Sequence, residues 1–340
     1  EVSSHIIGFN NVDGKGQEGI ELQYNSFLTG QDGYLEYRKD LKGGVASKAE
    51  ETYIEPKNGN NLMLSIDSRL QYAAYKYLKK GVLEFNAEGG SVVIEDIHTG
   101  EILAMVNYPS YNPNDMSDAY PDKRRNRAVT DVYELGSVMK VFTAAAAFTY
   151  GDFRPDTEIN TSPGYFRIGK NTVRDFRDYG KMDIRHILMK SSNVGVSKMI
   201  LSMEDQSILP NSLYDYNFGM KTGIELPGER SGFVPLKDKW GEFQLATLSF
   251  GYGMNATDMQ LVSAMSGIAN NGNYIKPTML KRDPNEEIES RPIVSAQASK
   301  DIVDMLQSVV EDAGGTGSLA KTELYHVAGK TGTARKLSSN

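Results

Sequence analysis

The sequence predicts an α+β domain, in which strands stand on either side of a long helical insert. Three observations lead to this fold class. Residues Gly90–Glu95 form a short apolar run that is typical of a strand. The middle of the chain is rich in alanine and methionine at helical spacing. Apolar residues alternate again over 325–328, which predicts a strand towards the other end.

The individual elements follow from periodicity and from turns that contain glycine. The polar stretch up to about residue 60 contains several Asp-Gly and Gly-Gly pairs, and we expect it to bury no core unaided. Residues 66–85 have the spacing of an amphipathic helix, and a turn at Thr99-Gly100 leads into a second strand over 102–105. Further helices are predicted over Ile184–Lys190, 259–269 and 298–310, where the methionines are expected to fill the core.

The composition favours a globular chain and disfavours several functions. The 340 residues are 39% hydrophobic, which is enough for a sizeable core in one large domain or two. A formal net charge of −7 disfavours a nucleic-acid partner, so the basic cluster over 123–127 is predicted to be salt-bridged or solvated. The absence of cysteine excludes disulfides and thiol catalysis. The four histidines are scattered, and neither a metal nor a cofactor is predicted.

The most informative motif is Ser137-Val138-Met139-Lys140, which is followed by an apolar, alanine-rich run. A serine and a lysine three residues apart share one face of a helix. Serine needs a neighbouring base, and a lysine with a pKa of about 10.4 is neutral only about once in two to three thousand molecules at pH 7. Burial in the apolar helix, or a second cation, would lower that pKa. The motif therefore predicts an activated nucleophile.

Two further motifs follow in the chain. Ser191-Ser192-Asn193 comes after the helix predicted at Ile184–Lys190 and could present a hydroxyl and an amide to a cleft. Lys330-Thr331-Gly332-Thr333 continues the strand predicted over 325–328, and it offers a charge, hydroxyls and close backbone approach to a substrate carboxylate.

Each motif alone has a plainer explanation. Ser137 could cap a helix, Asn193 could end one, and Lys330-Thr331-Gly332 could be a strand and a turn. Near copies also occur. Ser318-Leu319-Ala320-Lys321 follows a Gly-rich stretch and is interpreted as a flexible loop, while Lys221-Thr222-Gly223 is interpreted as part of a strand and turn.

In this order the three motifs are those of the penicillin-recognising serine acyl-transferases. The chain resembles the transpeptidase region of class B penicillin-binding proteins, closest to the division-specific type known as penicillin-binding protein 3. The resemblance extends over nearly the whole chain, in segments 14–21, 28–33, 64–71, 99–105, 108–113, 125–131, 222–229 and 251–253. Leu135, Val138 and Val141 depart from the family, which often has Pro, Thr and Pro there, and this affects the expected geometry at the start of the helix more than the reaction.

The resemblance implies an antiparallel sheet between helical layers, as in penicillin-binding proteins and serine β-lactamases, and it implies acyl transfer. Ser137 would attack a peptidoglycan stem peptide, with Lys140 as its base. Ser191 would relay a proton, and Asn193 would bind the substrate amide or Lys140. Lys330 would keep Lys140 neutral. The remaining implied roles belong to the Lys-Thr-Gly motif: Thr331 and Thr333 orient the substrate carboxylate beside Gly332, and the backbone N–H groups of Ser137 and Thr333 form the oxyanion hole.

The resemblance also implies a domain organisation and a location. Residues 1–60 would be the remnant of an N-terminal pedestal and linker, and residues 61–340 a transpeptidase domain that lacks its C-terminal end. The full protein would have a single N-terminal anchor in the bacterial inner membrane, outside this chain, with the catalytic domain in the periplasm. Its partners would be stem peptides, β-lactam antibiotics bound covalently at Ser137, and division-machinery membrane proteins that include a glycan polymerase.

Alternatives remain open at this stage. Within enzymes they are an elongation-type transpeptidase or, further away, a D-alanyl carboxypeptidase or a β-lactamase, for which no water-activating glutamate is assignable. From another class, the chain could be a non-catalytic scaffold or sensor that keeps the same fold. Intact Ser137, Lys140 and Lys330 argue against the scaffold.

Overall fold

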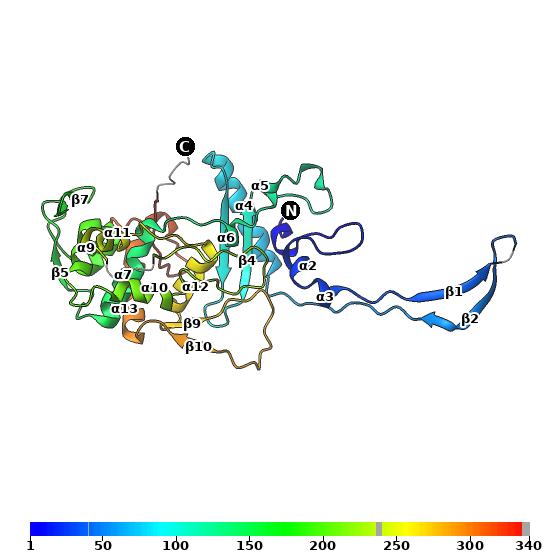
Figure 1. The fold of residues 1–340 in the computed structure, drawn as a ribbon. Coiled ribbons are helices and arrows are strands. Elements are labelled where there is room, and N and C mark those ends of the chain that lie inside the picture. Colours follow the sequence, from blue (N-terminus) through cyan, green and yellow to red (C-terminus); the bar gives the residue numbers. More distant parts are fainter. Residues whose placement is uncertain (40, 236–239, 335–340) are drawn as a thin grey trace.

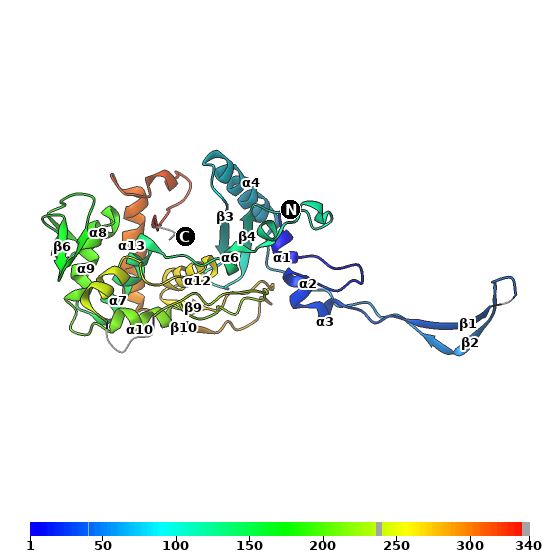
Figure 2. The ribbon, with the colours of Figure 1, turned by 45° about the horizontal axis from the view of Figure 1, so that its top comes forward.

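The computed structural model describes residues 1–39, 41–235 and 240–334 (Figure 1). Three regions follow one another along the molecule: a long hairpin, a central pair of strands beside helix α4, and a group of helices around α7 (Figures 1 and 2). No helix in these residues is both long and apolar enough to cross a membrane.

The N-terminal region consists of short helices and a hairpin that extends away from the rest of the molecule (Figure 1). Its elements are α1 (Ser4–Ile7), α2 (Gly19–Gln23), α3 (Asn25–Leu28), β1 (Tyr34–Lys39) and β2 (Val45–Ile54). The two strands are antiparallel. Ile6 and Ile20 are buried, but they pack against Ile102 and Met105 of the central region. This part therefore contributes to a core that it does not form alone, as the sequence predicts.

The central region is an antiparallel strand pair between helices (Figure 2). Its elements are α4 (Ser68–Glu84), β3 (Gly90–Glu95) and β4 (Ile102–Tyr108). The Asp67 side chain accepts hydrogen bonds from the backbone N–H groups of Arg69 and Leu70, which caps α4 at its start. All three elements were predicted from the sequence, with bounds that differ by three residues or fewer.

Alternation along β3 directs its side chains to two different helices. Val92 and Ile94 line a groove with side chains of α4. On the other face, Ser91 donates a hydrogen bond to Asp258, and Ser263 donates one to Glu95. Asp258 and Ser263 belong to α12 (Asp258–Ala269). The strand pair thus lies between two helical layers.

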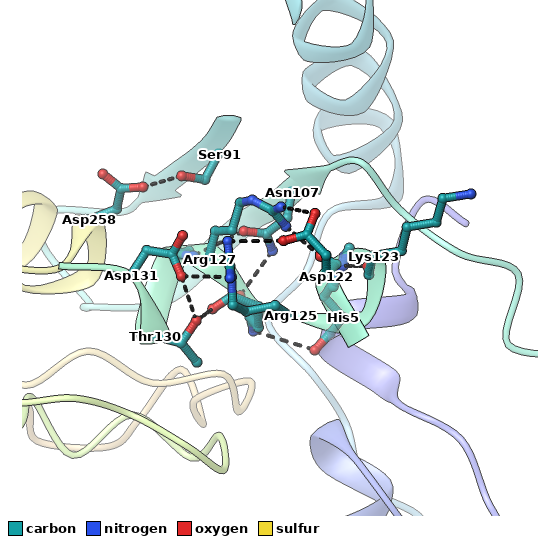
Figure 3. Close-up of polar contacts among 12 residues, drawn as sticks. His5, Ser91, Asn107, Asp122, Lys123, Arg125, Arg127, Thr130, Asp131 and Asp258 are labelled. Atoms are coloured by element: carbon teal, nitrogen blue, oxygen red, sulfur yellow. Dashed lines mark hydrogen bonds and ion pairs between the residues drawn. The ribbon is translucent and has the colours of Figure 1, made fainter. Parts of the chain in front are cut away.

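The segment from α5 (Pro121–Arg124) to α6 (Arg127–Thr130) joins the N-terminal region to the centre (Figure 3). Arg127 is 8% exposed and forms an ion pair of 2.8 Å with Asp122. Asn107 of β4 accepts a hydrogen bond of 2.9 Å from the backbone N–H of Ala128. The His5 ring lies 2.7 Å from the Lys123 carbonyl oxygen. The basic cluster is therefore salt-bridged, as predicted, and is part of an internal joint.

The helical region is organised around α7 (Met139–Tyr150), whose residues from Met139 to Phe148 are all buried. A helix that is apolar on every side requires neighbours on every side. The alanines of α7 permit close packing, and helices α8, α9, α10 and α13 contact it. The neighbouring helices are α8 (Ile184–Lys190), α9 (Asn193–Leu201), α10 (Ile208–Asp215), α11 (Glu242–Leu248) and α13 (Ala296–Glu311).

Short strands and 3₁₀ turns complete the described chain. The strands are β5 (Glu158–Asn160), β6 (Tyr165–Ile168), β7 (Asn171–Arg174), β8 (Lys181–Asp183), β9 (Asn273–Ile275) and β10 (Ser290–Pro292), and the 3₁₀ turns are η1 (Met116–Asp118), η2 (Gly136–Val138) and η3 (Ser318–Ala320). The strands pair as β5–β8, β6–β7 and β9–β10.

Two strand predictions are wrong. Residues 325–334 form no strand, because within the described residues no neighbouring strand provides a ladder of hydrogen bonds for them. Lys221-Thr222-Gly223 also forms no strand. Its Thr222 donates from both N–H and hydroxyl to Glu229, so a local turn satisfies these polar groups instead.

Candidate active site

The predicted nucleophile lies where the chain enters the buried helix. Ser137 is in η2, directly before α7, and is partly exposed. Lys140 is in the first turn of α7 and is 0% exposed. Its Nζ lies 2.7 Å from Ser137 Oγ, so the spacing of three residues does place both groups on one side of the helix.

Ser191, the first residue of the Ser-Ser-Asn motif, contacts the same Lys140 amine. Lys140 Nζ lies 2.9 Å from the carbonyl oxygen of Ser191 and 3.0 Å from its Oγ. Ser191 ends helix α8 in the left-handed conformation, with φ 59° and ψ 43°. Few residues other than glycine adopt this conformation, and it costs roughly 1 to 2 kcal/mol. It lets the carbonyl and the hydroxyl of one residue face the same lysine.

Lys330 approaches Ser191 from the C-terminal side of the chain. Its Nζ lies 3.1 Å from Ser191 Oγ and 2.9 Å from the carbonyl oxygen of Thr331. The Ser191 hydroxyl therefore lies between two lysines, one from helix α7 and one from a segment that is distant in sequence. The structure thus brings Ser137, Lys140, Ser191 and Lys330 together.

Burial lowers the pKa of both lysines. Burial lowers the pKa of Lys140 to about 7, with a further lowering by the charge of Lys330 and an opposing effect of Asp175. Burial also lowers the pKa of Lys330 to about 8. Near neutral pH a substantial fraction of Lys140 is therefore an uncharged amine, which can accept a proton from a serine hydroxyl.

Asn193 lies in the same loop but has a different partner. Its side-chain Nδ2 donates a hydrogen bond of 3.1 Å to the carbonyl oxygen of Arg174. Within the described residues, the hydrogen bonds of Lys140 go to Ser137 and Ser191. The role expected of Asn193 stays a prediction.

The Lys-Thr-Gly segment packs against the nucleophile turn through glycine positions. A Cβ added to Gly332 would lie 2.7 Å from a methyl carbon of Val138, and one added to Gly136 would lie 2.4 Å from the carbonyl oxygen of Thr333. Such distances are shorter than van der Waals contact. Only glycine permits the backbones around Ser137 and Thr333 to approach this closely.

A third glycine supports the turn from the other side. The backbone N–H of Gly136 donates to the carbonyl oxygen of Gly251 at 3.2 Å. Gly251 has φ 93°, and an added Cβ would lie 2.1 Å from the carbonyl oxygen of Gly136. Gly251 belongs to the family-like segment 251–253, but nothing in the sequence pattern predicts this contact.

Next to the turn is a cavity of about 730 Å³. It is bordered by both the nucleophile turn and the Lys-Thr-Gly segment, and its lining includes Tyr133, Glu134, Val138, Asn255 and Gly332. Ser137 itself is not among the lining residues, so the cavity adjoins the turn through Leu135 and Val138.

The near copies of the motifs have separate surroundings. Ser318 lies in η3, and Lys321 donates through Nζ to the carbonyl oxygen of Glu311 at 2.9 Å. His326, the histidine nearest to Lys330 in sequence, lies 3.2 Å from a Glu311 carboxylate oxygen. The side chains of Lys321 and His326 thus contact Glu311 and are not paired with a serine hydroxyl in these contacts.

Sequence reasoning missed Asp175. It lies after β7, and its carboxylate accepts hydrogen bonds from Ser192 and from the first two N–H groups of α9. No motif marks this aspartate, because it meets the Ser-Ser-Asn loop only through the tertiary fold.

The chain matches two protein families. Residues 90–340 match the family described as "Penicillin binding protein transpeptidase domain", and residues 3–64 match "Penicillin-binding Protein dimerisation domain". Among curated proteins, it is 38% identical over 338 residues to the probable peptidoglycan D,D-transpeptidase PbpC of Pseudomonas aeruginosa, covering 99% of this chain and 59% of the relative. It is 40% identical over 337 residues to the peptidoglycan D,D-transpeptidase FtsI of Escherichia coli, covering 99% of this chain and 56% of the relative.

Solved structures agree with these relatives. Penicillin-binding protein 3 of Mycobacterium tuberculosis superimposes with a TM-score of 0.85 at 29% identity, over 99% of this chain and 75% of that one. The transpeptidase domain of penicillin-binding protein 3 from Burkholderia pseudomallei gives a TM-score of 0.74 at 32% identity, over 82% of this chain and 78% of that one. The predicted α+β fold class is confirmed. The chain spans a little over half the length of these two curated relatives, and it belongs to the penicillin-binding protein transpeptidase family.

Proposed function

We propose that this chain is the catalytic part of a peptidoglycan D,D-transpeptidase that cross-links stem peptides during septal cell-wall synthesis. The observation that carries the proposal is the position of Lys140. Its buried amine lies 2.7 Å from Ser137 Oγ and has a pKa lowered to about 7. A lysine with these properties is a base suited to activating a serine.

In the first half-reaction, Ser137 Oγ attacks the carbonyl carbon of the penultimate D-alanine of a stem peptide. The hydroxyl proton passes to Lys140 as the C–O bond forms. The C–N bond to the terminal D-alanine then breaks, and the proton passes through Ser191, which lies 3.0 Å from Lys140 Nζ, to the departing amine. The product is an ester between Ser137 and the shortened peptide.

In the second half-reaction, an amine of a neighbouring peptide strand attacks this ester. Lys140 takes the proton from the amine and returns one to Ser137 as the ester bond breaks, so the enzyme is regenerated. The backbone N–H groups of Ser137 and Thr333 donate hydrogen bonds to the oxyanion of the tetrahedral intermediate. Losing one such donor costs about 2.7 to 4 kcal/mol of transition-state stabilisation. Thr331 and Thr333, beside Gly332, orient the substrate carboxylate, and Asn193 contacts the substrate amide.

β-Lactams fit the same proposal, because the amide of their strained ring replaces the scissile peptide bond and Ser137 opens it. Structures of the M. tuberculosis penicillin-binding protein 3 in complex with aztreonam and with ampicillin support this assignment. The expected product is a covalent adduct at Ser137.

We further propose a setting for the whole protein, which the resemblance to class B relatives supports. Residues 1–60 belong to the pedestal and residues 61–340 to the transpeptidase domain. The catalytic region works in the periplasm, and an N-terminal anchor holds the protein in the inner membrane. A membrane-embedded glycan polymerase of the division machinery provides the strands to be cross-linked.

The proposal is tested by supplying a donor peptide that ends in D-Ala-D-Ala together with a labelled primary amine. We expect the full-length protein to release D-alanine and to form a product that carries the amine in its place, detected by mass spectrometry. The Ser318→Ala variant serves as a matched control and should behave identically. Release of D-alanine with only the hydrolysed peptide would indicate a carboxypeptidase instead. No product and no β-lactam adduct would indicate the scaffold.

The glycine contact at the nucleophile turn leads to a separate prediction. Gly251→Ala should lower the rate constant of β-lactam acylation by about 10²-fold, because the methyl group must displace the turn by an amount on the order of 1 Å. Gly253→Ala is the matched control. Gly253 also has positive φ, 86°, but an added Cβ would meet nothing within 4 Å. Equal acylation rates in both variants, at equal melting temperatures, would contradict the positioning role of Gly251.

A further inference from the structure

One charged side chain near the candidate site has no part in the reaction as described above. Asp175 follows β7 and is partly buried, and its own N–H is held by the carbonyl oxygen of Gly164 at 2.9 Å. Its Oδ1 accepts hydrogen bonds from the N–H groups of Asn193 at 2.6 Å and Val194 at 3.0 Å. Its Oδ2 accepts one of 2.5 Å from the Ser192 hydroxyl. One carboxylate thus holds three donors at the start of α9.

This arrangement exceeds what the helix requires for its own cap. Ser192 already caps α9, since its Oγ accepts a hydrogen bond of 2.8 Å from the N–H of Gly195. Asp175 comes from a different segment, and its carboxylate accepts hydrogen bonds from both the capping residue and the N–H groups of the helix. Hydrogen bonds to an ionised carboxylate are roughly twice as strong as neutral ones, and a negative charge at a helix N-terminus is favourable.

The held residues are the direct continuation of Ser191. Ser191 has the left-handed conformation, and its backbone N–H donates to Leu188 while that of Ser192 donates to Ile187. The loop is therefore fixed to α8 before Ser191 and to Asp175 after it. Ser191 Oγ has the two lysines at 3.0 and 3.1 Å. A shift of Ser192 would move this hydroxyl out of reach of one lysine or the other.

We propose that Asp175 is a positioning residue of the acyl transfer: it holds Ser191 between Lys140 and Lys330 and places a negative charge opposite Lys140. This inference rests on the proposed function, because it assigns Asp175 a role in the acylation of Ser137. Asp175 itself touches neither the nucleophile nor, in the proposed mechanism, the substrate.

The charge of Asp175 has an effect that its hydrogen bonds alone would not have. Within the described residues, the charged groups that act on Lys140 are Lys330, which lowers its pKa, and Asp175, which raises it. Ser137 and Ser191 face the amine with uncharged oxygens. Removing the charge of Asp175 should therefore lower the pKa of Lys140 further, so that the neutral amine persists to lower pH.

Two substitutions separate position from charge. Asp175→Asn keeps an oxygen acceptor for the helix N–H groups and can donate to Ser192 Oγ, but it removes the charge. Asp175→Ala removes both. For Asp175→Asn we expect a maximal acylation rate within a few-fold of the wild type and a pH profile whose rising limb moves to lower pH. For Asp175→Ala we expect the same shift of the rising limb, together with a plateau rate about 10²-fold lower, because Ser191 is no longer held.

The measurement is the rate constant for adduct formation with a β-lactam as a function of pH, together with the melting temperature of each variant. Asp178→Asn is the matched control. Asp178 lies in the same loop and accepts hydrogen bonds from Ser162 and Gly180, both at 2.9 Å, outside α9. Its profile should equal that of the wild type.

Clear results would overturn the inference. The inference is wrong if Asp175→Ala acylates at the wild-type rate. It is also wrong if the rising limb of Asp175→Asn stays in place or moves to higher pH. If Asp175→Ala fails to fold, the pH profile of Asp175→Asn decides. Failure of the proposed function is recognised separately, because then the wild type itself would form no adduct.

Discussion

Ser137→Ala is expected to abolish the covalent adduct that a β-lactam forms with this chain, while Ser318→Ala leaves the adduct intact. Of these two serines, Ser137 has its hydroxyl beside a buried amine, with Lys140 Nζ 2.7 Å away. Ser318 has the same sequence spacing to Lys321, but that lysine donates through Nζ to the Glu311 carbonyl oxygen. Intact mass before and after incubation with the β-lactam measures the outcome directly.

The pair of variants makes this result specific, because both remove one serine hydroxyl from a Ser-x-x-Lys motif. An adduct that persists in Ser137→Ala, or disappears in Ser318→Ala, would show that the nucleophile is assigned wrongly. Absence of any adduct in the folded, full-length wild type would favour the non-catalytic scaffold.

Lys140→Met is expected to lower the acylation rate constant by about 10²- to 10⁴-fold, the range typical for loss of a general base. The base works in its neutral form. Since the pKa of Lys140 is lowered to about 7, the wild-type rate should rise with pH through that value and reach about one tenth of its plateau at pH 6. Lys321→Met removes the lysine of the second motif and should leave the rate and the profile unchanged. A Lys140→Met variant that acylates at the wild-type rate would contradict this role.

The same measurement tests the influence of Lys330. Its charge lowers the pKa of Lys140, and with its own pKa near 8 it is still mostly charged where Lys140 titrates. Lys330→Met should therefore raise the pKa of Lys140 and move the rising limb of the profile to higher pH. A limb that stays in place would show that burial alone accounts for the lowered pKa.

Local sequence patterns were sufficient to predict those helices and strands whose apolar face packs against a neighbouring element. The helix predicted over 66–85 lies at Ser68–Glu84, and the strand Gly90–Glu95 has the predicted bounds. In both, apolar spacing coincides with a face that packs on another element. The helices predicted over 259–269 and 298–310 are also present, within two residues at each end.

Local sequence patterns gave wrong predictions where the secondary structure depends on hydrogen-bond partners elsewhere in the chain. The apolar alternation over 325–328 predicts a strand, but a strand exists only beside another strand, and the described residues provide none for this segment. Lys221-Thr222-Gly223 has the same sequence as the Lys-Thr-Gly motif, but Thr222 donates hydrogen bonds to Glu229 and the segment forms a turn. Neither outcome can be deduced from the segment itself.

The sequence by itself determined which side chains are available for the proposed acyl transfer and, through the helical spacing of three residues, that Ser137 and Lys140 face each other. Only the tertiary structure decided that Ser191 lies between Lys140 and Lys330, that Gly251 supports the nucleophile turn, and that Asp175 holds the loop of Ser191. The reason is physical. A repeat along one helix is local geometry, whereas the distance between remote segments, and the burial that lowers the pKa of Lys140, depend on how the whole chain packs.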